Sequence, residues 1–167
     1  DRCEFCGASK EVYDREDALE TYAYPFIHSD ITQTIFNNMK FDVIVGNPPY
    51  QLSDAGHGRS ASPIYQKFIE QAKKLNPRYL TMIIPARWFA GGKGLDEFRN
   101  EMLTDKRVRK SVDFENSNEI FPGVDVAGGI CYFLWDRDNE GLCEVTNFHN
   151  GNEIKSVRPL NEFSIFI

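Results

Sequence analysis

Apolar runs of strand length alternate along the chain with amphipathic stretches of helix length. The run FDVIVG, residues 41–46, is apolar except for Asp42, which is typical of a parallel strand covered on both faces. Residues 107–116 instead alternate apolar and polar positions and read as an edge-like strand. Asn150-Gly151 separates two short segments and predicts a hairpin turn. The predicted strands cover residues 25–30, 41–46, 78–89, 107–116 and 126–136, with the hairpin over 143–157.

Three stretches have helical character, and residues 58–77 are the best delimited. There Ser62 is a candidate N-cap, Pro63 occupies a first helical position, and Asn76-Pro77 marks the end. Residues 94–103 form a second amphipathic helix, and residues 32–39 are a third helix-length stretch. The predicted buried faces comprise Ile64, Phe68, Ala72 and Leu75 in the first helix, and Leu95, Phe98 and Met102 in the second.

This alternation of strands and helices predicts an α/β sheet with parallel strands and right-handed crossovers. In such sheets ligands bind beyond the carboxyl ends of the strands. Asn47 directly follows Gly46, the last residue of a predicted strand. We therefore expect the Asn47 amide to point into the ligand-binding cleft.

Composition and charge narrow the class of protein. The chain has 167 residues, of which 41% are apolar, and this suits one domain with a hydrophobic core. No run of eighteen apolar residues and no charged-then-apolar leader occurs, so we expect neither a membrane span nor a signal peptide. The net charge of −6 does not indicate a basic nucleic-acid-binding face. One cationic run could contact phosphates, although such runs are more often solvated surface: Lys106, Arg107, Arg109 and Lys110.

The four cysteines give no strong metal signal. Cys3 and Cys6 have the C-x-x-C spacing of half a zinc site, but a structural zinc site needs four ligands. Cys131 and Cys143 lie far downstream, and Cys131 is expected in a strand core. We expect reduced thiols and no bound metal. A zinc knuckle completed by residues upstream of the chain is the alternative.

The stretch Asn47-Pro48-Pro49-Tyr50 places an amide, two prolines and an aromatic ring at the mouth of a strand. Prolines fix the backbone and remove N–H donors, so the carbonyl groups remain as acceptors. Such a corner suits a planar group that carries an NH₂. The Asn47 side-chain oxygen and the Pro48 carbonyl can bind both hydrogens and draw the nitrogen toward tetrahedral geometry, while the ring stacks on Tyr50.

The lone pair of that nitrogen is then directed at an electrophile, for which the methyl group of S-adenosylmethionine is the natural candidate. A base inside a duplex cannot reach such a pocket and has to be flipped out of the stack.

The segment DVIVGNPPYQ resembles the catalytic motif of amino-group DNA methyltransferases, in which Asp, Asn or Ser precedes Pro-Pro and then Tyr or Phe. IHSDI is similar to the family segment whose acidic residue binds the adenine amine of the cofactor, and LTMIIPARWF resembles the next strand. EIFPGVDVAGGICYFLWDR resembles the aromatic-containing hairpin region that closes over the target base. The resemblance covers about residues 26–137 and is greatest to N6-adenine methylases of restriction–modification systems.

This resemblance implies a Rossmann-like, S-adenosylmethionine-dependent methyltransferase fold and an enzyme that methylates the N6 amine of a flipped-out adenine in double-stranded DNA. Asn47 and Pro48 would bind the target amine, and Tyr50 and Phe121 would stack on the base. The cofactor would be held by Asp30, which would accept from its adenine amine, and by Ile31, Asn47 and Pro49. The family also implies a cytoplasmic protein of bacteria or archaea.

One departure from the family is large. The family's cofactor loop, an aromatic residue plus glycines after a first strand, should precede Asp30, and residues 1–25 contain no such loop. The chain also starts without Met. We therefore expect a fold that is incomplete at its N-terminal, cofactor-loop side and a chain that is inactive alone.

Three parts are expected. Residues 1–25 would be a polar, irregular or helical segment with the C-x-x-C pair, and residues 26–138 the catalytic-motif half of the methyltransferase domain. Residues 139–167 would be a β extension toward a recognition region outside the chain.

Other interpretations of the motif stay open. Asn-Pro-x-Tyr also occurs in peptides that phosphotyrosine-binding-type domains bind, and Asn and Pro are common in strand-ending turns. The same motif serves methylases of other planar nitrogens, namely the glutamine side-chain amide of a translation factor and guanine in ribosomal RNA. An inactive fragment kept for fold or interaction is the non-enzymatic alternative.

Overall fold

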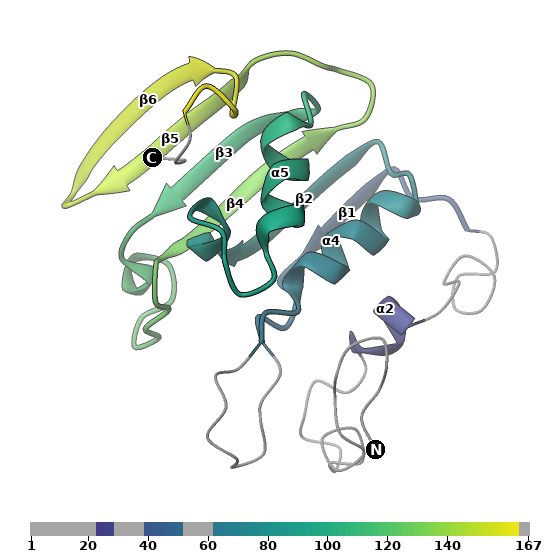
Figure 1. Cartoon of the computed structure of the whole chain (residues 1–167), viewed down its shortest axis with the longest axis horizontal. Helices are drawn as coiled ribbons and strands as arrows, with labels where there is room; N and C mark the ends of the chain where they lie inside the picture. The colour runs from purple at the N-terminus through teal and green to yellow at the C-terminus, as the bar shows by residue number, and fades with distance from the viewer. Residues whose placement is uncertain (1–22, 29–38, 52–61, 164–167) are drawn as a thin grey trace, which may run out of the picture.

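A computed structural model describes residues 23–28, 39–51 and 62–163 of the chain. Its centre is a six-stranded sheet with the order β1-β2-β4-β3-β5-β6 (Figure 1). The strands are β1 (Val43–Gly46), β2 (Tyr79–Pro85), β3 (Val108–Phe114), β4 (Ile130–Asp136), β5 (Cys143–His149) and β6 (Asn152–Arg158). The predicted α/β class is confirmed.

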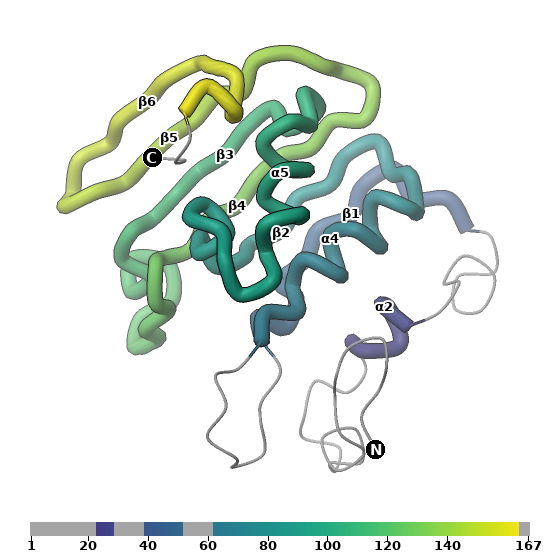
Figure 2. Tube along the Cα trace, in the orientation of Figure 1, coloured from purple at the N-terminus to yellow at the C-terminus, as the bar shows by residue number. Residues whose placement is uncertain are grey.

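The strand directions bring the carboxyl ends of four strands to one edge of the sheet. β2 is parallel to β1, and β4 is antiparallel to both of its neighbours, β2 and β3. β1, β2 and β3 therefore point the same way, and so does β5, which is parallel to β3. Figure 2 follows the chain through these strands. We call the edge at which β1, β2 and β3 end the carboxyl edge, and the opposite one the amino edge.

β3 lies inside the sheet, between β4 and β5, so its prediction as an edge-like strand is wrong. The burial of β3 does not follow the alternation of its sequence. The pairing with β4 shifts register between Val108 and Lys110, so Val108 and Ser111 are both buried although they are three positions apart, whereas Lys110 is exposed.

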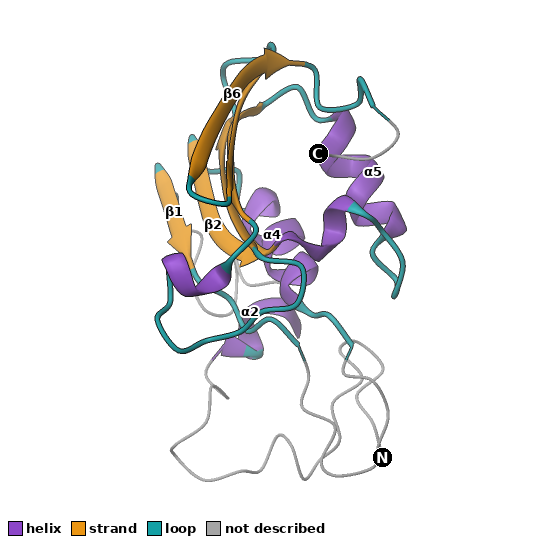
Figure 3. Cartoon of the chain, turned by 90° about the vertical axis from the view of Figure 1, so that its left-hand side faces the viewer, coloured by secondary structure: helices purple, strands orange, loops and turns teal. Residues whose placement is uncertain are grey.

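Helices α4 (Tyr65–Lys74) and α5 (Asp96–Thr104) lie on one face of the sheet (Figure 3). The predicted apolar faces are confirmed, because Phe68, Ala72 and Met102 are buried, with Ile64, Leu95 and Phe98, while Leu75 is half-buried at the end of α4. No described helix is long and apolar enough to cross a membrane.

Two local predictions are wrong. α4 begins at Tyr65 with Ile64 at the N-cap position and no capping side chain, so Ser62 is not the cap. The reason is that Pro63 forms an isolated antiparallel bridge with Gln51, which keeps the chain extended up to that point. The predicted strand over residues 25–30 is instead helical in α2 (Pro25–His28).

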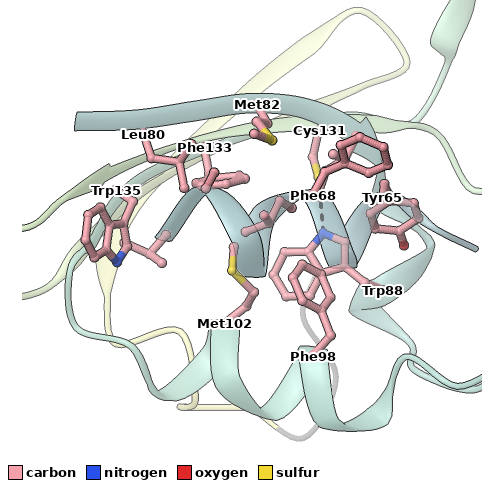
Figure 4. Close-up of a cluster of buried hydrophobic side chains, with 14 of the residues drawn as sticks. Tyr65, Phe68, Leu80, Met82, Trp88, Phe98, Met102, Cys131, Phe133 and Trp135 are labelled. Atoms are coloured by element: carbon pink, nitrogen blue, oxygen red, sulfur yellow. Dashed lines mark hydrogen bonds between the residues drawn. The ribbon is translucent and has the colours of Figure 1, made fainter. Parts of the chain in front are cut away.

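A compact apolar cluster fills the space between the two helices and the sheet (Figure 4). Trp88, Trp135, Tyr65 and Phe133 are its largest fully buried side chains. Trp88 Nε1 donates a hydrogen bond to Cys131 Sγ at 3.4 Å, and Cys131 is 1% exposed, which confirms its predicted core position. The large rings fix the distance between sheet and helices and so position the ends of the strands.

Neither α4 nor α5 covers the opposite face of the sheet (Figure 3). On this open face Val43 is 52% exposed and Val45 is 73% exposed. The prediction that β1 is covered on both faces is therefore wrong for the described residues, although its parallel pairing is confirmed. Only the face that carries Ile44 packs against the core.

The predicted hairpin is confirmed. β5 and β6 pair antiparallel and are joined through Asn150 (φ 50°) and Gly151 (φ 75°). Positive φ at both positions is the requirement of a type I′ turn, which Asn-Gly favours. The hairpin extends the same sheet beyond β3.

Candidate active site

Asn47 lies at the carboxyl edge because β1 ends at Gly46. The parallel register pairs Gly46 with Met82, in the middle of β2, so β2 continues past the point at which β1 stops. The Asn47 side chain is exposed there, and within the described residues its amide has no hydrogen-bond partner. Asn47 therefore presents an exposed amide at the end of β1, and its place in a ligand-binding cleft stays a prediction.

The two prolines that follow are fixed in different environments. Pro48 is buried, and Pro49 is half-buried. The chain is then tied to the start of α4, because Ile64 N donates to the Tyr50 carbonyl oxygen at 3.1 Å. The motif is thus held at both ends, by β1 and by α4, and the ring-locked backbone between them is rigid.

The hydroxyl end of Tyr50 is buried. The residue is half-buried, and its Oη is shielded from solvent with no hydrogen-bond partner among the described residues. Burial raises the pKa of Tyr50 to about 12, and the neighbouring Cys131 adds to the effect. The side chain therefore stays a neutral phenol at physiological pH, and its ring is a candidate stacking surface.

β2 leads into the short helix η2 (Ala86–Phe89), which adjoins the motif at the same edge. Ala86 N donates to the Gly129 carbonyl at 3.0 Å, and Trp88 is buried. Arg87 lies between these two anchored residues and is exposed. Trp88 therefore packs in the core, whereas no sequence motif distinguishes Arg87. Arg87 could have been identified only by its position directly after β2, the strand that neighbours the motif strand β1.

Phe121 lies in the loop that connects β3 to β4, and hydrogen bonds between residues of this loop hold its shape. Ser117 is buried, its Oγ donates to the Val124 carbonyl at 2.7 Å, and it accepts from Val126 N at 2.9 Å. Phe121 N donates to the Ser117 carbonyl at 2.8 Å. These bonds give the half-buried Phe121 a defined place at the carboxyl edge.

Gly129 closes this loop where β4 begins. Its φ is 80°, and a side chain there would overlap the carbonyl oxygen of Phe114. Only glycine combines that conformation with so close a backbone approach.

Asp113, near the end of β3, is a further carboxyl-edge residue that the sequence analysis gave no site role. It receives a long hydrogen bond of 3.5 Å from Asn147 Nδ2, and its Oδ1 is buried without a partner among the described residues. Burial raises the pKa of Asp113 to about 6.

The cationic run at residues 106–110 lies at the amino edge, where β3 begins, and therefore opposite the motif. Arg107 Nε binds Asp105 Oδ1 at 2.7 Å, and Lys110 Nζ lies 3.5 Å from Glu144 Oε2. These contacts agree with the interpretation of the run as structural and solvated surface.

Four predicted residues lie outside the described part of the chain: Asp30 and Ile31 of the cofactor side, and Cys3 and Cys6 of the candidate zinc pair. Within the described ranges, no cluster of three or more His, Cys, Asp or Glu side chains could hold a metal ion.

Comparison with known proteins agrees with this architecture. An uncharacterized adenine-specific methylase of Mycoplasma pneumoniae is 40% identical over 149 residues, which cover 83% of this chain and 35% of that protein. The chain thus spans about a third of this relative's length.

Two solved structures share the fold. A chain of a type I restriction–modification system has a TM-score of 0.50 at 18% identity, over 73% of this chain and 26% of that one. The type IIL restriction-modification enzyme MmeI, solved in complex with DNA, has a TM-score of 0.51 at 13% identity, over 78% of this chain and 20% of that one.

The described sheet is therefore part of the S-adenosylmethionine-dependent methyltransferase fold that the sequence predicts. Residues 2–121 match the family described as Eco57I restriction-modification methylase, over a span that includes the whole Asn47–Tyr50 motif. The chain belongs to the Eco57I restriction-modification methylase family.

Proposed function

We propose that the complete protein transfers a methyl group from S-adenosylmethionine to the N6 amine of a flipped-out adenine in double-stranded DNA, and that residues 47–50 form the amine-binding part of its active site. The observation that carries this proposal is the Asn47 amide, which is exposed at the carboxyl edge with no partner in the described part of the chain. A polar group left free on a rigid backbone is suited to bind a ligand.

The chemistry of the acceptors fits an aromatic amine. Asn47 Oδ1 and the Pro48 carbonyl would accept the two N–H groups and weaken the conjugation of the nitrogen with the ring. The nitrogen lone pair would then be free to attack. When bound, the cofactor supplies the electrophilic methyl group. The nitrogen loses one proton once the new N–C bond has formed, so no strong base is required beforehand.

The remaining predicted residues would hold the target base and the adenine ring of the cofactor. Tyr50, with its hydroxyl end buried, would keep its ring fixed as a stacking surface, and Phe121 would contact the base from the β3–β4 loop. Pro49 is half-exposed beside Asn47 and offers apolar surface to the adenine ring of the cofactor. Asp30 and Ile31 are proposed to complete the cofactor side.

The bare side of β1 supports the proposal that further α/β units complete this sheet. β1 pairs only with β2 among the described strands, and its Val43 and Val45 side chains are exposed. The crossover from β1 to β2 places α4 on one face of the sheet. A parallel strand added on the free edge of β1 would, with the same right-handed crossover, place its helix on the open face.

The carboxyl end of β1 would then be the point at which the strand order reverses. Ligands bind at such a point in open α/β sheets. We likewise propose that residues 1–25 and 139–167 are segments that flank this catalytic half, with the exposed β6 leading toward a recognition region.

A methyl-transfer assay tests the function. The complete protein is incubated with S-adenosylmethionine labelled in its methyl group and with duplex DNA, and the labelled nucleoside is identified. Asn47→Ala removes one of two acceptors and should reduce the rate about 10²–10³-fold. The melting temperature should change little, because Asn47 is exposed and unpartnered in the described structure.

Tyr50 provides a matched pair in the same assay. Tyr50→Phe keeps the ring and loses only a hydroxyl that has no described partner, so it should retain activity, whereas Tyr50→Ala should lose the stacking surface. Full activity of the Asn47→Ala protein would refute the mechanism. Label in guanine of RNA or in a protein glutamine would replace adenine as the substrate.

A further inference from the structure

Arg87 is a cation at the same edge as the motif. We compared the four residues that follow each of the strands β1, β2 and β3, namely residues 47–50, 86–89 and 115–118, all of which the structure describes. Arg87 is the one Lys or Arg among these twelve positions, and it follows β2, the direct neighbour of the motif strand. β2 extends three residues beyond Met82, which pairs with Gly46, and Arg87 follows two residues after the end of β2, at the carboxyl edge.

The backbone of Arg87 is fixed although its side chain is free. On one side, Ala86 is 3% exposed, and its N–H donates a hydrogen bond to the Gly129 carbonyl. On the other side, Trp88 is 1% exposed, and its ring N–H donates a hydrogen bond to the Cys131 sulfur. Gly128 packs on the Arg87 backbone, because a Cβ on this glycine would lie 3.8 Å from the Arg87 Cα. The guanidinium is exposed and makes no ion pair or hydrogen bond in the described structure.

Several cations at the amino edge differ from Arg87 in this respect. At the amino edge, Lys73 binds Glu101 at 2.8 Å, Arg107 binds Asp105 at 2.7 Å, and Arg137 binds Asp138 at 2.8 Å. These side chains are engaged within the protein and lie opposite the motif. Arg87 instead lies beside Tyr65 in the first turn of α4: burial raises the pKa of the Tyr65 hydroxyl, and the Arg87 charge opposes that shift.

The net charge of the chain makes such a residue important. At −6, the chain as a whole repels a polyanion, and the loop that carries Phe121 adds Glu119 and Asp125 near the carboxyl edge. A DNA strand that delivers a base to Asn47 has to bring its phosphates to this edge. An unpaired guanidinium with a fixed backbone is the group best suited to receive one of them.

We propose that Arg87 binds a backbone phosphate beside the flipped adenine and thereby positions the strand at the Asn47 motif. This inference rests on the proposed function and goes beyond it by naming a DNA-contacting residue outside the motif. Arg87 is a positioning residue for the target strand. It takes no part in the bond changes at the amine.

The test measures the salt dependence of DNA binding by the complete protein. Each neutralised phosphate contributes about 0.9 to the slope of log affinity against log salt concentration. Arg87→Gln should therefore lower this slope by about 0.9 and weaken duplex binding about 8-fold at 0.1 M salt. Arg87→Lys retains the charge and should retain most of the slope.

Lys106→Gln is the matched control, because it changes the net charge equally at an exposed position of the amino edge. It should change neither slope nor affinity. If Arg87 had only a structural role, Arg87→Gln would lower the melting temperature. The salt slopes of Arg87→Gln and Arg87→Lys would then be the same.

The outcomes separate this inference from the function on which it rests. If the unaltered protein methylates DNA and requires Asn47, but Arg87→Gln has an unchanged salt slope, the role of Arg87 is refuted and the function stands. Equal losses in Arg87→Gln and Lys106→Gln would also refute it, since they would indicate a general charge effect. If the unaltered protein neither binds nor methylates DNA, both proposals fail.

Discussion

Asp105 joins α5, α4 and the strands β3 and β4, and its replacement by asparagine gives the sharpest stability prediction. Its carboxylate accepts hydrogen bonds from Arg107 Nε at 2.7 Å, from Trp135 Nε1 at 2.9 Å and from Lys73 Nζ at 3.1 Å. The Asp105 side chain is only 7% exposed. Asp105→Asn keeps the shape but removes the negative charge on which these three donors converge.

The pKa of this carboxyl gives the size of the loss. Burial alone would raise the pKa, but the hydrogen bonds from Arg107, the charge of Lys73 and the Trp135 bond together lower it from 3.8 to about 2. At 1.36 kcal/mol for each pH unit, the ionised form contributes about 2 kcal/mol to folding at pH 7. Because the pKa of the folded state is lowered, this contribution is present above pH 3.8 and is lost as the pH falls toward 2. About half of it remains at pH 3.

Urea unfolding of the unaltered and Asp105→Asn proteins at pH 7 and pH 3 measures both values. The difference in unfolding free energy should be about 2 kcal/mol at pH 7 and about half of that at pH 3. Glu101→Gln is the control: Glu101 also binds Lys73, at 2.8 Å, but is 47% exposed, so it should cost at most about 1 kcal/mol. If Asp105→Asn lowers the free energy of unfolding equally at both pH values, the electrostatic account is refuted. The loss would then arise from packing alone.

Two further predictions concern the carboxyl edge. Burial raises the pKa of Asp113 to about 6, so the folded state holds this proton more tightly than the unfolded chain and loses stability as the pH rises from about 4 to 6. Asp113→Asn should therefore stabilise the protein by about 1–2 kcal/mol at pH 8, allowing for partial exposure, and have little effect at pH 3. Thermal unfolding at the two pH values checks this, and an equal effect at both would contradict it. Gly129→Ala should cost roughly 2–4 kcal/mol, because the methyl group would overlap the Phe114 carbonyl at a positive φ. Gly123→Ala shares the positive φ of 82° but has open space around it, so it should cost only about 1 kcal/mol by the same measurement; equal losses would show that φ alone matters.

The sequence predicted the main elements because their signals were local. The apolar run that ends at Gly46, the helical spacing of Phe98 and Met102, and the Asn150-Gly151 turn each determine a structure within a few residues. The position of Asn47 at a strand end followed directly from the first of these. Its identity as a candidate amine-binding residue came from the resemblance of four consecutive residues to a family motif, and it remains a prediction.

What the sequence did not predict depends on partners distant along the chain. The antiparallel direction of β4 is set by its pairing with β2 and β3, and no local pattern encodes direction. Ser62 failed as a cap because Pro63 pairs with Gln51 across the residues 52–61 that separate them. Arg87 could be recognised only when the sheet order placed β2 next to β1 and the other cationic run at the opposite edge.

The antiparallel direction of β4 also has a consequence for engineering. Because β4 runs against β3, the loop between them leaves the sheet and returns to it at the same edge, and Gly129 fixes its point of return. The two ends of the loop are therefore held by the strands β3 and β4. Between them, the Ser117 side chain forms hydrogen bonds to the backbone of the loop itself. Segments of this kind can be lengthened, shortened or exchanged with little effect on the scaffold that carries them. The β3–β4 loop is thus a segment in which the proposed aromatic contact of Phe121 can be redesigned while the Asn47 motif stays in place.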